Sequence, residues 1–181
     1  MTGTVLEPGK LPAALLRRLL APFKKDTPEL LLPPSVGEDA GVIGIGGGAL
    51  VTATDPITMT GNEVGGHAVL INANDVAVLG VRPRWFLAVF LLPVGTTVSE
   101  VEGIFENMRQ TLEALDIVLV GGHTEVTDAV NQPVVTGQIL GSRRMVILSK
   151  QAVFDREIKY CKLGLRPWRV QLSLRWNWGR S

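Results

Sequence analysis

Residues 84–93, RWFLAVFLLP, form a nearly continuous apolar run with the length of one β-strand. A strand that is apolar on both faces usually lies in the interior of a sheet, so we expect this strand to be central. The chain before it, residues 64–80, is rich in small apolar residues and predicts a helix. The chain after it, residues 99–116, has apolar side chains at helical spacing, and Ser99 is its expected N-cap. The fold is therefore predicted to place a helix before and after a central strand.

Shorter runs on both sides of this unit complete the predicted fold. Residues 11–24 predict a helix that ends or kinks at Pro22, and the proline-rich residues 27–36 predict a connector. Further strands are expected after GEDA (37–40), over residues 49–56, 117–122 and 133–141, with the glycines at 46–48 as a hairpin turn. This order predicts an α+β domain, in which helices pack on one face of a four- to five-stranded mixed sheet.

The composition is that of a globular domain. Of the 181 residues, 46% are hydrophobic and 19% are charged, which argues against disorder. Apolar runs stay below the roughly 18 residues that span a bilayer, and residues 1–10 lack the pattern of a secretory signal. The single cysteine, Cys161, excludes a disulfide framework or a cysteine-based metal cage. A cytoplasmic protein is expected.

Four short polar segments, each with at least one acidic residue, lie between or within the apolar helices and strands. They are GEDA (37–40), TATD (52–55), NAND (72–75) and GGHTE (121–125). An ionised Asp on the packed face of a helix, as NAND predicts, costs several kcal/mol unless it is paired or binds a metal. Between Arg18 and Arg109 the basic residues are few, namely Lys24, Lys25, Arg82 and Arg84.

The acidic residues of these segments therefore predict a cation from outside the chain. They are Asp39, Asp55, Asp75 and Glu125. Oxygen ligands without cysteine suit a hard ion, Mg²⁺ first, and Mg²⁺ of this kind usually accompanies a phosphate substrate. The structural alternative is that Asp75 caps a neighbouring element and that Asn72 and Asn74 satisfy backbone groups.

Other site types fit less well. The glycine-rich stretch GVIGIGGGAL (41–50) lacks the Lys-Ser/Thr ending of a P-loop and the spacing of a dinucleotide motif, so a hairpin turn explains it better. His67 and His123 are the only histidines, and they do not have the spacing of zinc ligands.

The polar segments also carry a family resemblance. GEDAGVI, TATDP, NANDVAVLGVRP and VGGHTEVT, in this order and at this spacing, resemble the amino-terminal domain of the aminoimidazole ribonucleotide (AIR) synthetase, or PurM-like, superfamily, and most of all its AIR synthase-related and HypE-like branch. The resemblance covers roughly residues 8–142. It implies a domain whose sheet pairs with that of a second copy in a barrel-like homodimer. It further implies ATP near that interface, Mg²⁺ on its phosphates, and phosphoryl transfer to a small-molecule or amide-bearing acceptor.

The resemblance also implies roles for individual residues. The expected metal ligands are Asp39, Asp55 and Asp75; the expected nucleotide contacts are Asn74, Gly122, Thr124 and Lys10; the expected catalytic residues are His123 and Glu125. Glu38 departs from the family's commoner GDDA, which leaves its place near the metal open. For His123 the alternative is a turn-stabilising histidine, and for Lys10 a solvated lysine before a helix.

The charge is divided unevenly along the chain. Residues up to Ser142 hold 8 basic and 15 acidic residues, a net charge of −7, whereas residues from Arg143 onward hold 10 and 2, a net charge of +8. We therefore expect an ATP-binding domain over 1–142 and an aberrant basic tail over 143–181, the frameshifted start of a missing carboxy-terminal domain. Arg166–Gln171, back-translated and read from the third base, gives Ala-Leu-Glu-Gly-Thr, which resembles a motif of the family's second domain. A tail that binds nucleic acid is the rival interpretation.

The sequence thus predicts an ATP- and Mg²⁺-binding domain of an ATP-dependent phosphoryl-transfer or synthetase-type enzyme related to AIR synthase and HypE. We expect this chain to be truncated and catalytically impaired on its own. The alternative is a non-catalytic dimeric scaffold of the same fold. The uncompensated carboxylates favour the first function over the scaffold, and the acidic body disfavours nucleic-acid binding.

Overall fold

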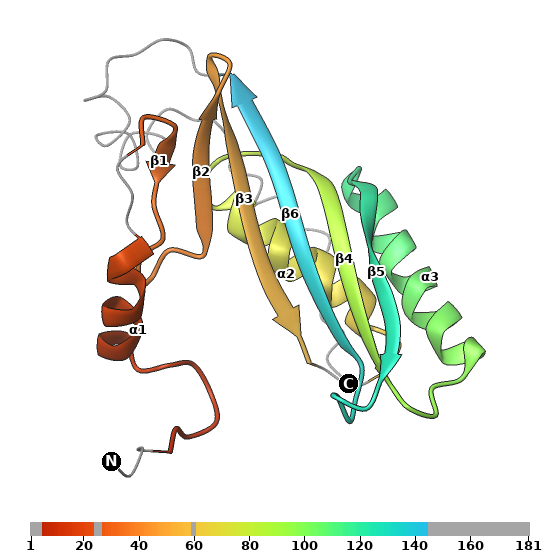
Figure 1. The fold of residues 1–181 in the computed structure, drawn as a ribbon. Coiled ribbons are helices and arrows are strands. Elements are labelled where there is room, and N and C mark those ends of the chain that lie inside the picture. The colour runs from red at the N-terminus through yellow and green to blue at the C-terminus, as the bar shows by residue number, and fades with distance from the viewer. Residues whose placement is uncertain (1–4, 24–26, 59–60, 145–181) are drawn as a thin grey trace, which may run out of the picture.

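A computed structural model describes residues 5–23, 27–58 and 61–144. These residues form one six-stranded sheet with the strand order β1-β2-β3-β6-β4-β5 (Figure 1). The strands are β1 (Leu30–Leu32), β2 (Ala40–Ile45), β3 (Gly48–Ile57), β4 (Pro83–Pro93), β5 (Val118–Thr127) and β6 (Val134–Arg144). The apolar run of residues 84–93 lies in β4, which is placed between β6 and β5 and is therefore an interior strand, as predicted.

The sheet is mixed, as predicted. β4 and β5 are parallel, while the other neighbouring strands are antiparallel. Parallel neighbours need a crossover, and the helix α3 (Val98–Leu115) supplies it between β4 and β5. β2 and β3 form the predicted hairpin, whose turn uses Gly46 and Gly47 at φ of 48° and 78°, a backbone region that favours glycine.

Two helices cover one face of the sheet. Figure 1 shows α2 (Val64–Ala77) and α3 together behind the strands, while α1 (Ala13–Leu20) and the 3₁₀-helix η1 (Ala21–Phe23) stand apart beside β1. No described helix covers the opposite face, which we call the open face. The α2–α3 contact is close because α2 begins with glycines: a Cβ at Gly65 would collide with the carbonyl oxygen of Ile104.

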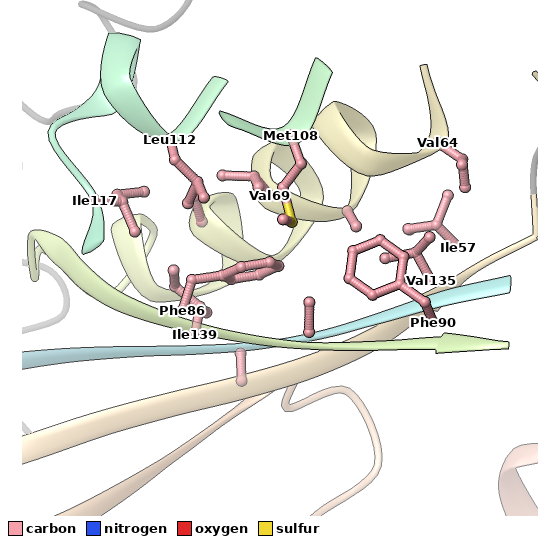
Figure 2. Packing of buried hydrophobic residues seen from close by; sticks show 14 of the residues in the cluster. Ile57, Val64, Val69, Phe86, Phe90, Met108, Leu112, Ile117, Val135 and Ile139 are labelled. Carbon is pink, nitrogen blue, oxygen red and sulfur yellow. The ribbon is translucent and has the colours of Figure 1, made fainter. Parts of the chain in front are cut away.

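The hydrophobic core lies between these helices and the sheet. Figure 2 shows Phe86 and Phe90 pointing from β4 toward the helices, where Met108 and Leu112 of α3 meet them. The ring of Phe90 stacks on Phe105 with 4.4 Å between centroids. Each fully buried side chain of this size contributes roughly 1.5–3 kcal/mol, so this layer carries most of the stability of the domain.

The N-cap of helix α3 lies two residues before the predicted one. It is Thr97 rather than Ser99: the Thr97 hydroxyl accepts a hydrogen bond from the backbone N–H of Glu100, and the Glu100 carboxylate accepts one from the Thr97 N–H at 2.7 Å. This reciprocal arrangement is a capping box. The sequence TTVSE contains this Thr-x-x-Glu match, which the choice of Ser99 overlooked.

Three predicted boundaries also differ from the structure. The proline-rich connector contains the short strand β1, which gives the sheet its sixth strand. β5 does not end at the glycines but continues through GGHTE to Thr127, because its pairing with β4 continues to Pro93. β6 ends at Arg144, three residues after the predicted end of this strand at Gly141, and residues 145–181 of the predicted tail lie outside the described residues.

Candidate functional site

Three of the predicted site residues gather beside helix α2, on the helix-covered face of the sheet. Asp55 lies on β3, two residues after Ala53 and two before Ile57, and so it shares the face of these buried residues. Asp75 lies near the end of α2, and Asp39 directly precedes β2. We call Asp39, Asp55 and Asp75 the acidic cluster.

The buried side chain of Asn72 holds α2 against β3 at this point. Its Oδ1 accepts a hydrogen bond from the backbone N–H of Asp55 at 2.8 Å. Its Nδ2 donates to the carbonyl oxygens of Asp55 at 3.2 Å and Ala68 at 2.8 Å. Asn72 is fully buried, and its amide is satisfied on both ends. Gly137, which pairs with Asp55 on β6, has no side chain, and the amide of Asn72 occupies the space that a Cβ at this position would fill.

The electrostatics of the cluster centre on Asp75. Its burial, and after that the negative charges of Asp55 and Asp39, raise the pKa of its carboxyl group to about 6. Lys10 opposes this shift, because its positive charge lowers the pKa of Asp75. Lys10 is more than 60 residues away from Asp75 in sequence, yet its charge acts on the Asp75 carboxyl group in the folded chain.

One oxygen of Asp75 lacks a partner. Oδ2 is buried and has no hydrogen bond among the described residues. Asp55 lies within hydrogen-bond reach of Asp75, but two ionised carboxylates cannot bond to each other without a shared proton. A buried, unpaired carboxylate oxygen is costly, and a cation satisfies it as a proton would. This oxygen and the oxygen-only donors around it fit a hard divalent ion.

The cluster is not a closed metal cage. Within the described ranges, no three His, Cys, Asp or Glu side chains converge tightly enough to hold an ion by themselves. Mg²⁺ commonly keeps several waters and takes only one or two protein carboxylates together with substrate phosphates. An Mg²⁺ ion at these carboxylates would therefore take its remaining ligands from water or from a phosphate group.

The GGHTE residues lie elsewhere on the sheet. His123 and Glu125 pair with Val89 and Leu91 of β4, whose neighbours Phe86, Ala88, Phe90 and Leu92 are buried beneath the helices. His123 and Glu125 therefore point to the open face, away from the acidic cluster. Their side chains contact each other, with 3.3 Å between Nε2 and Oε2, and both are exposed.

The strand register shows how far apart the two groups are. Asp55 pairs with Gly137, Gly137 with Ala88, and Ala88 with Gly122, so Asp55 and Gly122 lie level with each other across the sheet. Three strand spacings of about 4.8 Å separate them by about 14 Å. A single chain thus does not bring its predicted catalytic residues to its predicted metal ligands.

The predicted nucleotide contacts Gly122, Thr124 and Asn74 lie on two different elements, β5 and α2. Gly122 belongs to β5, where a Cβ would collide with the Ala88 carbonyl oxygen, so its absence of a side chain serves strand pairing. Thr124 pairs with Phe90 and so points to the helix-covered face. Asn74 is exposed on α2. The predicted site residues did not include Asn72, which positions Asp55 through hydrogen bonds to its backbone. These bonds agree with the structural alternative of the sequence analysis, in which Asn72 satisfies backbone groups.

The acidic cluster and most of the sheet lie in a stretch that matches a known protein family. The model for the N-terminal domain of AIR synthase related proteins matches residues 37–142, which include the whole acidic cluster. The chain belongs to the AIR synthase-related family. This confirms the superfamily inferred from the four polar segments and the α+β fold predicted with it.

Individual relatives of this AIR synthase-related chain cover parts of it. Carbamoyl dehydratase HypE of Rhodobacter capsulatus is 38% identical over 71 residues, which are 39% of this chain and 21% of that protein. The crystal structure of tt0281 from Thermus thermophilus matches with a TM-score of 0.61 and 26% identity over 74% of this chain and 44% of that one. The hydrogenase maturation protein HypE in complex with ATP matches with a TM-score of 0.50 and 26% identity over 67% and 36%.

The AIR synthase-related chain spans less than half the length of each of these three relatives. No helix in its described residues is long and apolar enough to cross a bilayer.

Proposed function

We propose that the acidic cluster binds the Mg²⁺-bearing phosphates of ATP, and that the chain is the ATP-binding domain of an ATP-dependent phosphoryl-transfer or synthetase-type enzyme. The observation that carries this proposal is Asp75, whose buried carboxylate oxygen has no hydrogen-bond partner in the described part of the chain and whose pKa is raised by burial and by two neighbouring acids. The HypE relative whose structure contains ATP supports the choice of nucleotide.

Each residue near the cluster has a role in this proposal. Asp55 and Asp75 offer oxygens to the ion, and Asp39 adds negative charge to the same region. Lys10 supplies the positive charge that a phosphate needs beside these acids. Asn72 fixes the backbone of Asp55 and thereby the distance between β3 and α2. When bound, Mg²⁺ neutralises the charge that develops on a transferred phosphoryl group, which is the main requirement of such chemistry.

We further propose that the chain forms a homodimer through its open face. That face carries apolar side chains that the described elements leave uncovered, including Val89 at 37% and Val118 at 57% exposure. Sheets that pack face to face bury such residues. His123 and Glu125 lie on the same face, so any catalytic role of theirs would be exercised at the dimer interface rather than at the cluster of their own chain. That role, and the small-molecule or amide-bearing acceptor, stay predictions.

Thermal unfolding with and without Mg²⁺ and a non-hydrolysable ATP analogue tests the nucleotide site. At about 100 times its Kd, the ligand should stabilise the native wild type by roughly 2.7 kcal/mol, which is a shift of a few degrees in Tm. We expect Asp75→Asn to abolish the Mg²⁺-dependent shift. Asp128→Asn, at an exposed turn between β5 and β6, is the matched control and should keep it.

The result also separates the two predicted functions. A wild type that shows no shift at millimolar ligand would favour the non-catalytic scaffold, in which the acidic cluster has no ligand. A shift that persists in Asp75→Asn would place the nucleotide elsewhere and contradict the proposed site.

A further inference from the structure

Helix α1 is an amphipathic helix without a covering partner among the described residues. The leucines of α1 follow one side, with Leu15 and Leu19 one turn apart and Leu16 and Leu20 beside them, and α1 buries none of its residues. Leu11 lies in the segment just before the helix. Leu11 and Leu19 are 41% and 48% exposed. Its last turn carries Arg17 and Arg18, and it contains no acid. A helix of eight residues is too short to be stable alone in water, so α1 needs another surface to pack against.

A groove of complementary character lies at the other edge of the sheet, between α3 and β5. Its volume is about 630 Å³, and the side chains of its floor are apolar, among them Phe105, Leu112 and Leu119. Leu119 is 43% exposed. The groove follows α3 from Glu102 to Glu113, about 16 Å at 1.5 Å per residue, whereas α1 is about 12 Å long.

The rim of this groove is acidic. It holds three glutamates and one arginine, namely Glu102, Glu106, Glu113 and Arg109. Arg109 bonds to Glu106 through Nε at 2.8 Å and also contacts Glu113. The hydrogen bonds from Arg109 and Gln110 lower the pKa of Glu106 to about 2, so Glu106 is ionised at neutral pH. The net negative charge of the rim matches the two arginines of α1.

We propose that α1 of one chain docks into the α3–β5 groove of a second copy of this chain. The two surfaces lie at opposite edges of one sheet (Figure 1), about 24 Å apart over five strand spacings, so they do not meet within a chain. This contact would be a second interface within the homodimer proposed above. It depends on that proposal only for the way in which the two sheets face each other.

That arrangement is geometrically consistent. When two sheets face each other across a two-fold axis that runs along the strands, the β1 edge of one copy lies beside the β5 edge of the other. Each α1 then reaches the groove of its partner, and the two contacts are equivalent and close the dimer.

Charge reversal in the full-length chain tests this contact. The α1 variant is R17E/R18E, and the groove variant is E102R/E106R/R109E/E113R, which keeps the ion pairs within α3 while it inverts the sign of the rim. Asp128→Lys is the control for a change of charge elsewhere. Sedimentation velocity without nucleotide should show wild type and control self-associating, and each reversed chain associating at least about tenfold more weakly, because like charges then meet.

The decisive measurement is an equal mixture of the two reversed chains, which should associate as tightly as wild type because both contacts of the mixed pair are again complementary. A monomeric wild type, reversed chains that associate normally, or a mixture of folded chains that stays apart would each overturn the proposal. Binding of α1 to anionic vesicles with unchanged self-association would assign it to a lipid surface instead. The shift in Tm caused by Mg²⁺ and the ATP analogue is measured in the reversed chains as well. If that shift persists while the predicted change in association is absent, the α1 contact is wrong and the nucleotide site is not.

Discussion

Asp75 is the residue at which stability and proposed function oppose each other. Its folded-state pKa is about 6, above the ordinary value of 3.8, so the native state binds a proton at Asp75 more tightly than the unfolded chain does. The protonated form therefore favours folding. As pH rises from about 4 to about 6, the carboxyl group of the native state ionises at a cost, and this contribution to stability is lost. A carboxylate kept at such a cost is typical of a ligand site.

We predict that Asp75→Asn is more stable than wild type in the absence of metal at pH 8, by roughly 1–2 kcal/mol once screening by solvent is allowed for. The difference in the free energy of unfolding should grow between about pH 4 and 6 and stay constant above, because Asn does not titrate. Urea unfolding at several pH values measures it. A variant that is less stable than wild type at pH 8 would show that Asp75 makes a stabilising contact which the described residues do not contain.

At the scale of elements, one amide joins helix α2 to strand β3. Asn72 makes three hydrogen bonds to the main chain, two of them to Asp55. Helix propensity disfavours Asn inside a helix, so its occurrence here reflects this tertiary contact rather than local preference. The same contact places Asp75, one helical turn later, over the strand that carries Asp55.

We predict that Asn72→Ala destabilises the fold by roughly 2–4 kcal/mol, because the buried N–H of Asp55 loses its acceptor and a cavity remains. The exposed neighbour provides the control: Asn74→Ala should change stability by less than about 0.5 kcal/mol. Denaturant unfolding monitored by circular dichroism compares the two. An equal loss of stability at both positions would argue against a structural role for the hydrogen bonds of Asn72 to β3.

At the scale of the whole molecule, the described helices cover only one face of the sheet. The alternation along β4 puts Phe86, Ala88, Phe90 and Leu92 under the helices and leaves Val89 exposed between them. An apolar open face in a chain with a complete core on the other side is typical of an interaction surface.

We predict that Val89→Glu makes the chain monomeric and leaves its far-ultraviolet circular dichroism unchanged, because Val89 is already exposed in the single chain. Sedimentation equilibrium measures the oligomeric state, and Val94→Glu, in the loop after β4, is the control because it is 73% exposed beyond the sheet. Dimerisation that survives Val89→Glu would exclude the open face as the interface.

Sequence patterns alone predicted the central strand, both covering helices and the α+β class, because apolar periodicity indicates directly which side of an element is buried. It also determined the family, since four polar segments in a fixed order are specific together. It did not reveal β1, because three residues between prolines have too little pattern, nor the continuation of β5, because glycines that normally end a strand here allow the close approach of β4.

Which of the predicted site residues lie together became clear only from the three-dimensional fold. The charges of Asp39 and Asp55 act on Asp75 although the three residues are spread over 37 positions of the chain. They are brought together because β2 pairs with β3 and because Asn72 of α2 bonds to the β3 backbone. The positive charge of Lys10 also acts on Asp75. His123 and Glu125 belong to the same family motif set, yet they point to the other face. The side of a sheet on which a residue lies depends on its register with neighbouring strands, and register is a property of pairing that no local stretch of sequence contains.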